Sequence, residues 1–98
     1  MIRIMFVCHG NICRSTMAEF VMKDMIKKEG LSDKVYVASS ATSREEIGNP
    51  VHYGTRNKLR EHGISTDGKY AVQLTKNDYK EYDYILGMDS YNIYNIHL

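Results

Sequence analysis

The sequence predicts an α/β fold in which an open, three-layer parallel sheet of about three strands carries helices on both faces. Short apolar runs alternate with segments of helical periodicity, which is the pattern of βαβ units with right-handed crossovers. The first apolar run also stops at a polar loop that contains glycine. Residues 1–98 show no linker or repeat, and we expect them to form a single domain.

The first predicted strand covers residues 2–7. A helix should follow, because Thr16 and Glu19 have the spacing of a capping box and five apolar residues repeat at helical intervals. These five are Ala18, Val21, Met22, Met25 and Ile26. We expect this helix to end near Gly30, after two lysines that suit the negative end of its dipole.

Residues 35–38 read as a second strand and residues 39–48 as a polar loop, because serines and threonines suit turns. Asn49 and Pro50 predict the start of a second helix, and Gly63 its end.

Thr75 and Asp78 open a short third helix, and residues 82–88 form a third strand. Asp89 should then cap a last helix over residues 90–96. In a parallel sheet, ligands bind beyond the carboxyl ends of the strands, so the loop that begins at Cys8 lies at the expected ligand site.

Composition and charge exclude several classes of function. The 13 basic and 12 acidic side chains are dispersed, so no basic run is available to neutralise a nucleic acid. The longest apolar stretch, residues 4–8, is too short for a membrane span or a secretory signal. Cys8 and Cys13 lie in one loop without paired CxxC motifs, so we expect a cytoplasmic protein with no structural disulfide, no metal and no cofactor.

The segment from Cys8 to Ser15 has the composition of a phosphate-binding loop. Successive N–H groups wound around a helix N-terminus can surround a phosphoryl group. Gly10 and Asn11 tolerate left-handed backbone angles, and the planar guanidinium of Arg14 can bind two phosphate oxygens. The predicted phosphate-binding residues are His9, Gly10, Asn11, Ile12, Cys13 and Arg14.

Cys8 is the predicted nucleophile, with Arg14 and Ser15 as the other catalytic residues. Donors that hold an anion also favour a thiolate, and the Ser15 hydroxyl can donate to the sulfur. The alternative is that Cys8 is a buried core cysteine and Arg14 a surface charge. Because the motif stands between a buried strand and an amphipathic helix, we favour the catalytic interpretation.

The segment from Cys8 to Ser15, continued by residues 17–19, resembles the low-molecular-weight protein tyrosine phosphatases. Further similarity lies at residues 39–41, 48–50, 63–64, 73–75 and 84–89, so it extends over nearly the whole sequence. The resemblance implies a flavodoxin-like phosphotyrosine phosphatase I fold and hydrolysis through a phosphocysteine without a cofactor. It also implies that Asn11 and Ser39 brace the loop, and that Cys13 can form a reversible disulfide with Cys8. A small buried side chain is the alternative for Cys13.

The sequence departs from the family in the residues that complete the reaction. Family members continue beyond the length of this chain and carry an Asp-Pro pair whose Asp protonates the leaving oxygen. The only proline here, Pro50, follows Asn49, so we expect a C-terminally truncated domain with impaired activity. Thr16 stands where the family often has Pro, and around Glu45 an aromatic residue of the family is replaced.

The leading hypothesis is therefore a protein tyrosine phosphatase that acts on a phosphorylated protein or a small aryl phosphate. The alternatives are a non-catalytic phosphate- or phosphopeptide-binding module and an inactive truncated product. Arsenate reduction would need further cysteines, and arginine phosphatases typically have Thr where Ile12 stands.

A homodimer or strand-exchanged oligomer is also expected, because a truncated sheet exposes the edge of its third strand. Tyrosines 79, 82, 84, 91 and 94 would contribute to it, although ordinary packing explains them equally well.

Overall fold

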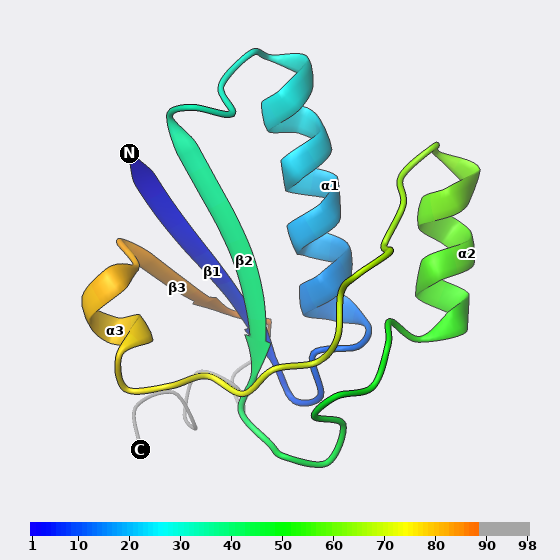
Figure 1. The fold of residues 1–98 in the computed structure, drawn as a ribbon, viewed down its shortest axis with the longest axis vertical. Coiled ribbons are helices and arrows are strands. Elements are labelled where there is room, and N and C mark those ends of the chain that lie inside the picture. The colour runs from blue at the N-terminus through cyan, green and yellow to red at the C-terminus, as the bar shows by residue number, and fades with distance from the viewer. Residues whose placement is uncertain (89–98) are drawn as a thin grey trace.

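The computed structural model describes residues 1–88 and contains a three-stranded parallel sheet of order β2-β1-β3 (Figure 1). The strands are β1 (Ile2–Cys8), β2 (Val35–Ala41) and β3 (Tyr84–Gly87). Cys8 lies opposite Ala41, and Val7 lies opposite Gly87, so the carboxyl ends of all three strands meet at one edge. The predicted open parallel sheet is confirmed. The predicted cap at Asp89 and the helix over 90–96 fall outside the described residues.

The central strand β1 has protein on both of its faces. Met5 and Val7 share one face and are buried against Ala38, Leu74, Tyr82 and Ile85. The segment between Leu74 and Tyr82 includes α3 (Asp78–Glu81) and covers this face. The helix α1 (Arg14–Lys28) packs against β1 and β2 on the opposite face, with α2 (Tyr53–Glu61) beside it (Figure 1). Helices thus lie on both faces, as predicted.

The N-terminus of α1 differs from the prediction. The helix starts at Arg14, and the Thr16 hydroxyl donates to the Cys13 carbonyl at 2.8 Å. Glu19 points to the sheet, where it contacts Ser39, so the predicted capping box is wrong. The predicted end is confirmed, because Gly30 has a φ of 69° just beyond the helix. No helix within residues 1–88 combines the length and apolarity that crossing a membrane requires.

The buried face of α1 is more polar than its apolar pattern predicts. Val21 and Met25 are 40% and 60% exposed, whereas Ser15, Thr16 and Glu19 are buried together with Ile26. The prediction of an apolar buried face is therefore only partly correct, because polar residues that bond to the loop or support it lie nearest the sheet.

Strand β2 runs to Ala41, three residues beyond the predicted end. Ser39 and Ser40 are each 1% exposed, and the β1 register pairs Ser39 with Phe6. The prediction of a loop from residue 39 is wrong at these three positions, because pairing with β1 outweighs the turn preference of serine.

The helix α2 begins later than Asn49 and Pro50 predict. Pro50 instead bridges Tyr70, and His52 caps the helix by accepting the Gly54 N–H at its Nδ1. The predicted end near Gly63 is confirmed, with a φ of 72° there.

Thr75 and Asp78 lie at the start of α3, as predicted, and bond to each other. The Thr75 N–H donates to Asp78 Oδ2 at 2.8 Å, and the Asp78 N–H donates to Thr75 Oγ1 at 3.3 Å. Strand β3 is shorter than the predicted 82–88. Asp83 lies just before it, where its N–H donates to the Arg3 carbonyl at 2.9 Å and its carboxylate accepts the Arg3 N–H at 2.8 Å.

Candidate active site

The strand β1 delivers Cys8 to the carboxyl edge of the sheet, where the chain turns through residues 9–13 into α1. Cys8 is 4% exposed, and its Sγ lies 2.8 Å from Ser15 Oγ and 3.2 Å from the backbone nitrogen of Asn11. Ser15 Oγ accepts the Asn11 side-chain amide, so the serine proton is left for the sulfur. Two donors therefore face the sulfur, an arrangement that stabilises a thiolate.

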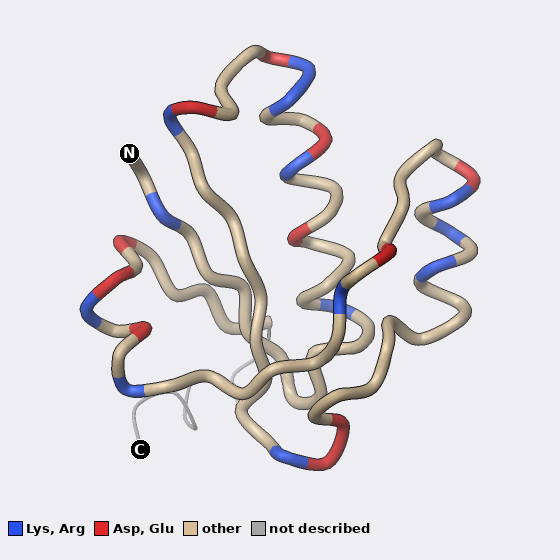
Figure 2. The backbone as a smooth tube through the Cα atoms, viewed as in Figure 1, with Lys and Arg blue, Asp and Glu red and all other residues tan. Residues whose placement is uncertain are grey.

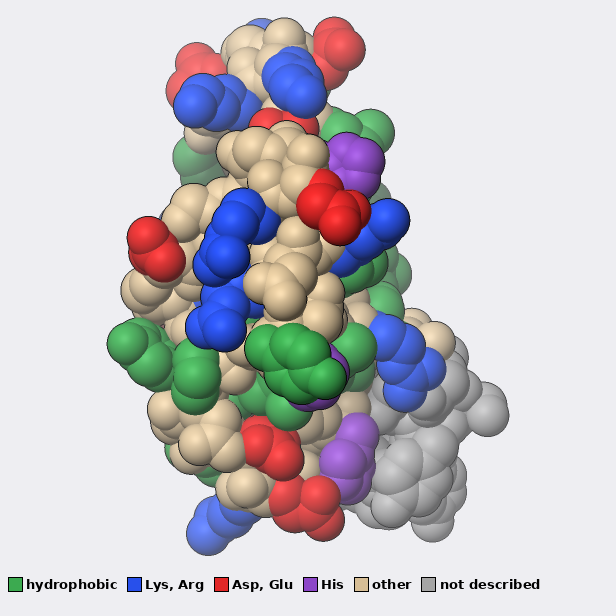
Figure 3. All heavy atoms as spheres, turned by 90° about the vertical axis from the view of Figure 1, so that its right-hand side faces the viewer, with side chains coloured by type: hydrophobic (Ala, Val, Ile, Leu, Met, Phe, Trp, Pro, Cys, Tyr) green, Lys and Arg blue, Asp and Glu red, His purple; other side chains and the backbone are tan. Residues whose placement is uncertain are grey.

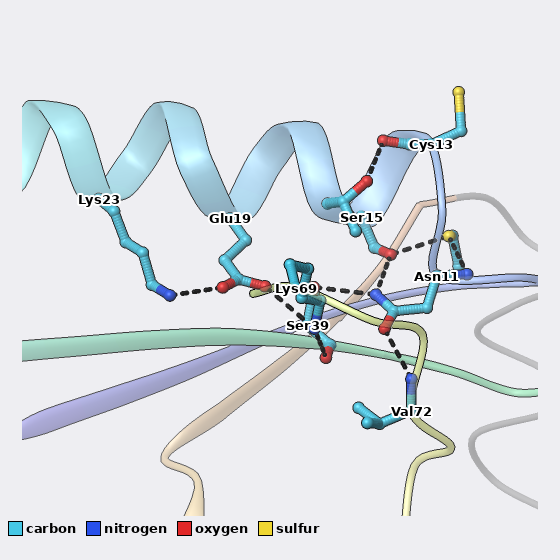
Figure 4. Close-up of polar contacts among 10 residues, drawn as sticks. Asn11, Cys13, Ser15, Glu19, Lys23, Ser39, Lys69 and Val72 are labelled. Atoms are coloured by element: carbon cyan, nitrogen blue, oxygen red, sulfur yellow. Dashed lines mark hydrogen bonds and ion pairs between the residues drawn. The ribbon is translucent and has the colours of Figure 1, made fainter. Parts of the chain in front are cut away.

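Asn11 holds the loop in its curled shape (Figure 4). Its φ is 58°, which makes it the non-glycine residue of positive φ among residues 1–88. The side-chain Nδ2 donates to Ser15 Oγ and to Ser39 Oγ, both at 2.9 Å, and Oδ1 accepts the Val72 N–H at 3.1 Å. The structure thus brings Asn11, Ser15 and Ser39 together beside Cys8.

The steric surroundings of Gly10, and not its backbone angles, favour glycine at this position. Its φ does not lie in the left-handed region, in contrast to the prediction. A Cβ at this position would stand 3.2 Å from Cγ of Glu46, closer than ordinary van der Waals contact. A larger residue here would therefore crowd the Glu46 side chain in the loop after β2.

Beneath Ser39 lies a buried cluster of charges that the sequence did not reveal. The Ser39 hydroxyl donates to the Glu19 carboxylate, whose side chain is 4% exposed. Glu19 is paired with Lys23 and, at 3.4 Å, with Lys69 Nζ, which also donates to the Ser39 carbonyl at 3.0 Å. Burial lowers the pKa of Lys69, and the Glu19 charge opposes that shift. A hydrogen-bonded chain therefore leads from Asn11 through Ser39 to a compensated buried carboxylate.

Sequence reasoning missed Glu19 and Lys69 for different reasons. Glu19 follows Ser15 by one helical turn, so its place on the same face was a usable signal. Lys69 lies in an irregular segment, and no periodic pattern predicts its approach to Glu19.

The rim of the loop carries the remaining predicted residues. Arg14 is exposed at the first position of α1, and Cys13 is exposed before it, with Sγ 3.2 Å from the Thr55 hydroxyl. Cys13 is thus not the small buried side chain of the alternative, and Figure 4 shows its sulfur pointing away from Ser15.

Two further contacts fix the rim to neighbouring elements. His9 Nε2 lies 3.1 Å from Glu45 Oε2 in the loop after β2. The Ile12 carbonyl accepts the His52 N–H at 2.8 Å, so α2 begins at the rim of the loop. A buried thiol under a helix N-terminus with an adjacent arginine is suited to hold a tetrahedral oxyanion and attack its central atom.

Comparison with known proteins gives a consistent picture. Residues 3–97 match the family described as low molecular weight phosphotyrosine protein phosphatase. The chain is 47% identical over 93 residues to the low molecular weight protein-tyrosine-phosphatase YfkJ of Bacillus subtilis, which covers 95% of this chain and 60% of YfkJ. It is 46% identical over 90 residues to the mouse low molecular weight phosphotyrosine protein phosphatase, covering 92% of this chain and 56% of the mouse protein.

The crystal structure of YfkJ has a TM-score of 0.96 to this chain at 45% identity, covering 99% of this chain and 61% of YfkJ. The chain spans less than two thirds of the length of these relatives.

Proposed function

Because the chain belongs to the low molecular weight phosphotyrosine protein phosphatase family, we propose that it hydrolyses phosphotyrosine or other aryl phosphomonoesters through a phosphocysteine intermediate. The observation that carries this proposal is the position of Cys8 Sγ, which is buried beside the Ser15 hydroxyl and the Asn11 N–H. A structural cysteine would not need two polar donors aimed at its sulfur.

In the first step, the Cys8 thiolate attacks the phosphorus of the bound ester. The P–O bond to the leaving group breaks as the S–P bond forms, and the aryl oxygen leaves with the electron pair. N–H groups of residues 9–14 and the guanidinium of Arg14 would bind the three equatorial oxygens, which carry the charge of the transition state.

In the second step, a water molecule attacks the phosphorus of the phosphocysteine. The S–P bond breaks, inorganic phosphate forms, and the Cys8 thiolate is regenerated. The Ser15 hydroxyl favours this step, because it donates to the departing sulfur as its negative charge develops.

The leaving oxygen needs a proton in the first step, and the 98 residues contain no Asp-Pro pair to supply it in the family's manner. General acid catalysis is typically worth about 10² to 10⁴ in rate. We therefore expect the 98-residue polypeptide to be slow, with the greatest handicap on phosphotyrosine, whose phenol has a pKa of about 10.

The decisive experiment compares p-nitrophenyl phosphate with phosphotyrosine and follows phenol release together with phosphocysteine by rapid-quench mass spectrometry. We expect phosphocysteine in the native protein, a rate ratio of at least about 10² in favour of the nitrophenyl ester, and no product with Cys8→Ser. Equal rates on the two esters would contradict the expectation that the leaving oxygen has no proton donor.

The second candidate is a phosphate- or phosphopeptide-binding module, which the donors beside Cys8 would also suit. The binding-module hypothesis would be supported if the native protein gave neither phenol nor phosphocysteine while Cys8→Ser still bound phosphate.

We also propose that copies of this chain associate through β3. Within residues 1–88, β3 is paired on one side, with β1, and its side chains Tyr84 and Leu86 are 58% and 43% exposed. Such an edge invites a strand from another copy. Of the other tyrosines in the expectation, Tyr79 is exposed and Tyr82 packs in the core, and positions 91 and 94 lie outside the described residues.

Light scattering at high protein concentration tests the association. We expect a dimer or larger species that Leu86→Lys shifts to monomer, because a charge on an edge strand opposes pairing. A monodisperse monomer of the native chain would end the proposal.

A further inference from the structure

A cavity of about 330 Å³ lies between α2 and the segment that follows it, away from the Cys8 loop. It is lined by Arg56, Arg60, Gly63, Ile64, Ser65, Thr66 and Asp67. We call it the arginine cavity. Figure 3 views the side of the molecule on which α2 lies and shows basic side chains gathered in one vertical patch near the centre of that face.

The charges around the arginine cavity are not balanced. Along α2, three basic residues precede the acidic Glu61 (Figure 2). Lys58 is paired with Glu61 at 3.4 Å, whereas no ion pair within residues 1–88 involves Arg56 or Arg60. The residues that line the cavity therefore include two arginines and one acidic residue, Asp67.

Arg56 supplies a second, independent observation. Its Nε is buried and has no hydrogen-bond partner, a state that is rare for a buried polar atom. Arg56 also borders a smaller cavity of about 140 Å³, which it shares with Thr66, Lys69 and Tyr70. Arg56 as a whole is only partly buried and lines both cavities. An anion that draws its side chain toward the larger cavity would give Nε the acceptor that it lacks in this conformation.

We propose that the arginine cavity is a second oxyanion site, which binds a phosphate or carboxylate group through Arg56 and Arg60. A guanidinium fork matches the two oxygens of either group, and binding would give the buried Nε its acceptor. Ser65 and Thr66 line the same cavity, and a hydroxyl group of this kind can donate to a remaining oxygen.

The place of α2 suggests where such an oxyanion comes from. His52 donates to Ile12, so the helix starts at the Cys8 loop. At about 1.5 Å per residue, Arg56 and Arg60 lie about 6 and 12 Å along the helix from His52. An extended chain of about two to four residues covers the same distance. The oxyanion is therefore either free phosphate or an acidic side chain near the phosphorylated residue of a bound protein, and the second source rests on the proposed function.

The test follows the Nε–H resonances of Arg56 and Arg60 in ¹H–¹⁵N spectra at constant ionic strength. An Arg14→Ala background weakens binding at the Cys8 loop, so the outcome does not depend on hydrolysis. Sodium phosphate is titrated in one arm and an unphosphorylated Glu-rich peptide in the other. Saturable shifts of both resonances in either arm support the site, and the arm that produces them identifies the source.

Two variants on α2 make the test specific. Arg56→Gln should weaken binding by at least about tenfold, because a charge-assisted hydrogen bond is lost. Arg60→Gln should have the same effect, and it takes the place of Arg56→Gln in the test if that variant fails to fold. Lys58→Gln is the matched control, since it removes the same charge from the same helix without touching the cavity. The proposal is overturned if neither probe shifts the two resonances, or if Lys58→Gln weakens binding as much as the arginine variants.

Discussion

The side-chain amide of Asn11 donates to Ser39 Oγ at 2.9 Å, across 28 residues of sequence. The same amide reaches Ser15 on α1, and the amide oxygen accepts the N–H of Val72. One side chain thus joins β2, α1 and a distant segment to a loop residue with positive φ. The shape of the loop depends on this side chain more than on the flexibility of its glycine.

Asn11→Ala should lower the free energy of unfolding by about 2 to 3 kcal/mol, because buried partners lose their hydrogen bonds and alanine tolerates a positive φ poorly. Urea unfolding measures the change. Asn57→Ala on the exposed side of α2 is the control and should stay within about 0.5 kcal/mol of the native protein. Similar losses for both variants would show that Asn11 does not organise the loop.

Glu19→Gln should destabilise the protein by about 3 kcal/mol, since it leaves Lys69 as a buried charge without its counter-ion. Asp24→Asn is the control. It removes the carboxylate of an i,i+4 pair whose other partner, Lys28, is largely exposed, so it should change the free energy of unfolding by less than about 0.5 kcal/mol. Thermal unfolding of the two variants side by side makes the comparison. An equally small effect at Glu19 would mean that the buried cluster adds nothing to the support of Ser39.

Alkaline pH should weaken the packing of Tyr82 against the sheet. Burial, followed by the neighbouring Tyr36, raises the pKa of Tyr82 from 10.0 to about 12. The neutral phenol is thus favoured in the folded state, so this contribution to stability is complete below pH 10 and is lost as the pH rises toward 12. Between these values, the native protein should lose stability more steeply than Tyr82→Phe, as measured by urea unfolding at each pH. Tyr84→Phe, at an exposed position, should follow the native protein, and identical slopes for native protein and Tyr82→Phe would refute the expectation.

Oxidation by hydrogen peroxide should inactivate the native protein reversibly and Cys13→Ser irreversibly. Peroxide would convert the Cys8 thiolate to a sulfenic acid, which the Cys13 thiol condenses with to give a disulfide and water. Cys8 Sγ contacts Ser15 whereas Cys13 Sγ contacts Thr55 and points away from Ser15 (Figure 4), so we expect the loop to rearrange before the two sulfurs meet. Activity after treatment with dithiothreitol, together with the masses of the oxidised forms, distinguishes the two cases. Equal recovery of both proteins would exclude a protective role for Cys13.

The strands and the loop could be predicted because their signals are local. The apolar run of β1 and the spacing of Cys8 and Arg14 need no knowledge of distant residues. The i, i+3 spacing shows the limit of local signals: Thr75 and Asp78 exchange side-chain-to-backbone bonds, but Thr16 and Glu19 do not, although their spacing is the same. Glu19 has Ser39 and Lys69 as competing partners, and these come from other elements.

The same reason explains the misplaced boundary of β2. Ser39 and Ser40 have the composition of a turn, and their place in a strand follows from pairing with β1. The arginine cavity and the buried Glu19–Lys69 pair likewise form only when separate segments of the chain pack together. A pattern in the sequence alone therefore does not reveal them.

The bond between Val72 and Asn11 spans 61 residues and has a consequence for biosynthesis. Cys8 leaves the ribosome early, but Val72, the last of the residues that bond to Asn11, follows more than 60 positions later. Until they dock, the thiol is exposed on a nascent chain whose sheet is incomplete, open to oxidants and to mixed disulfides. Slow synthesis of residues 39–72 would prolong the interval in which Cys8 lacks its neighbours.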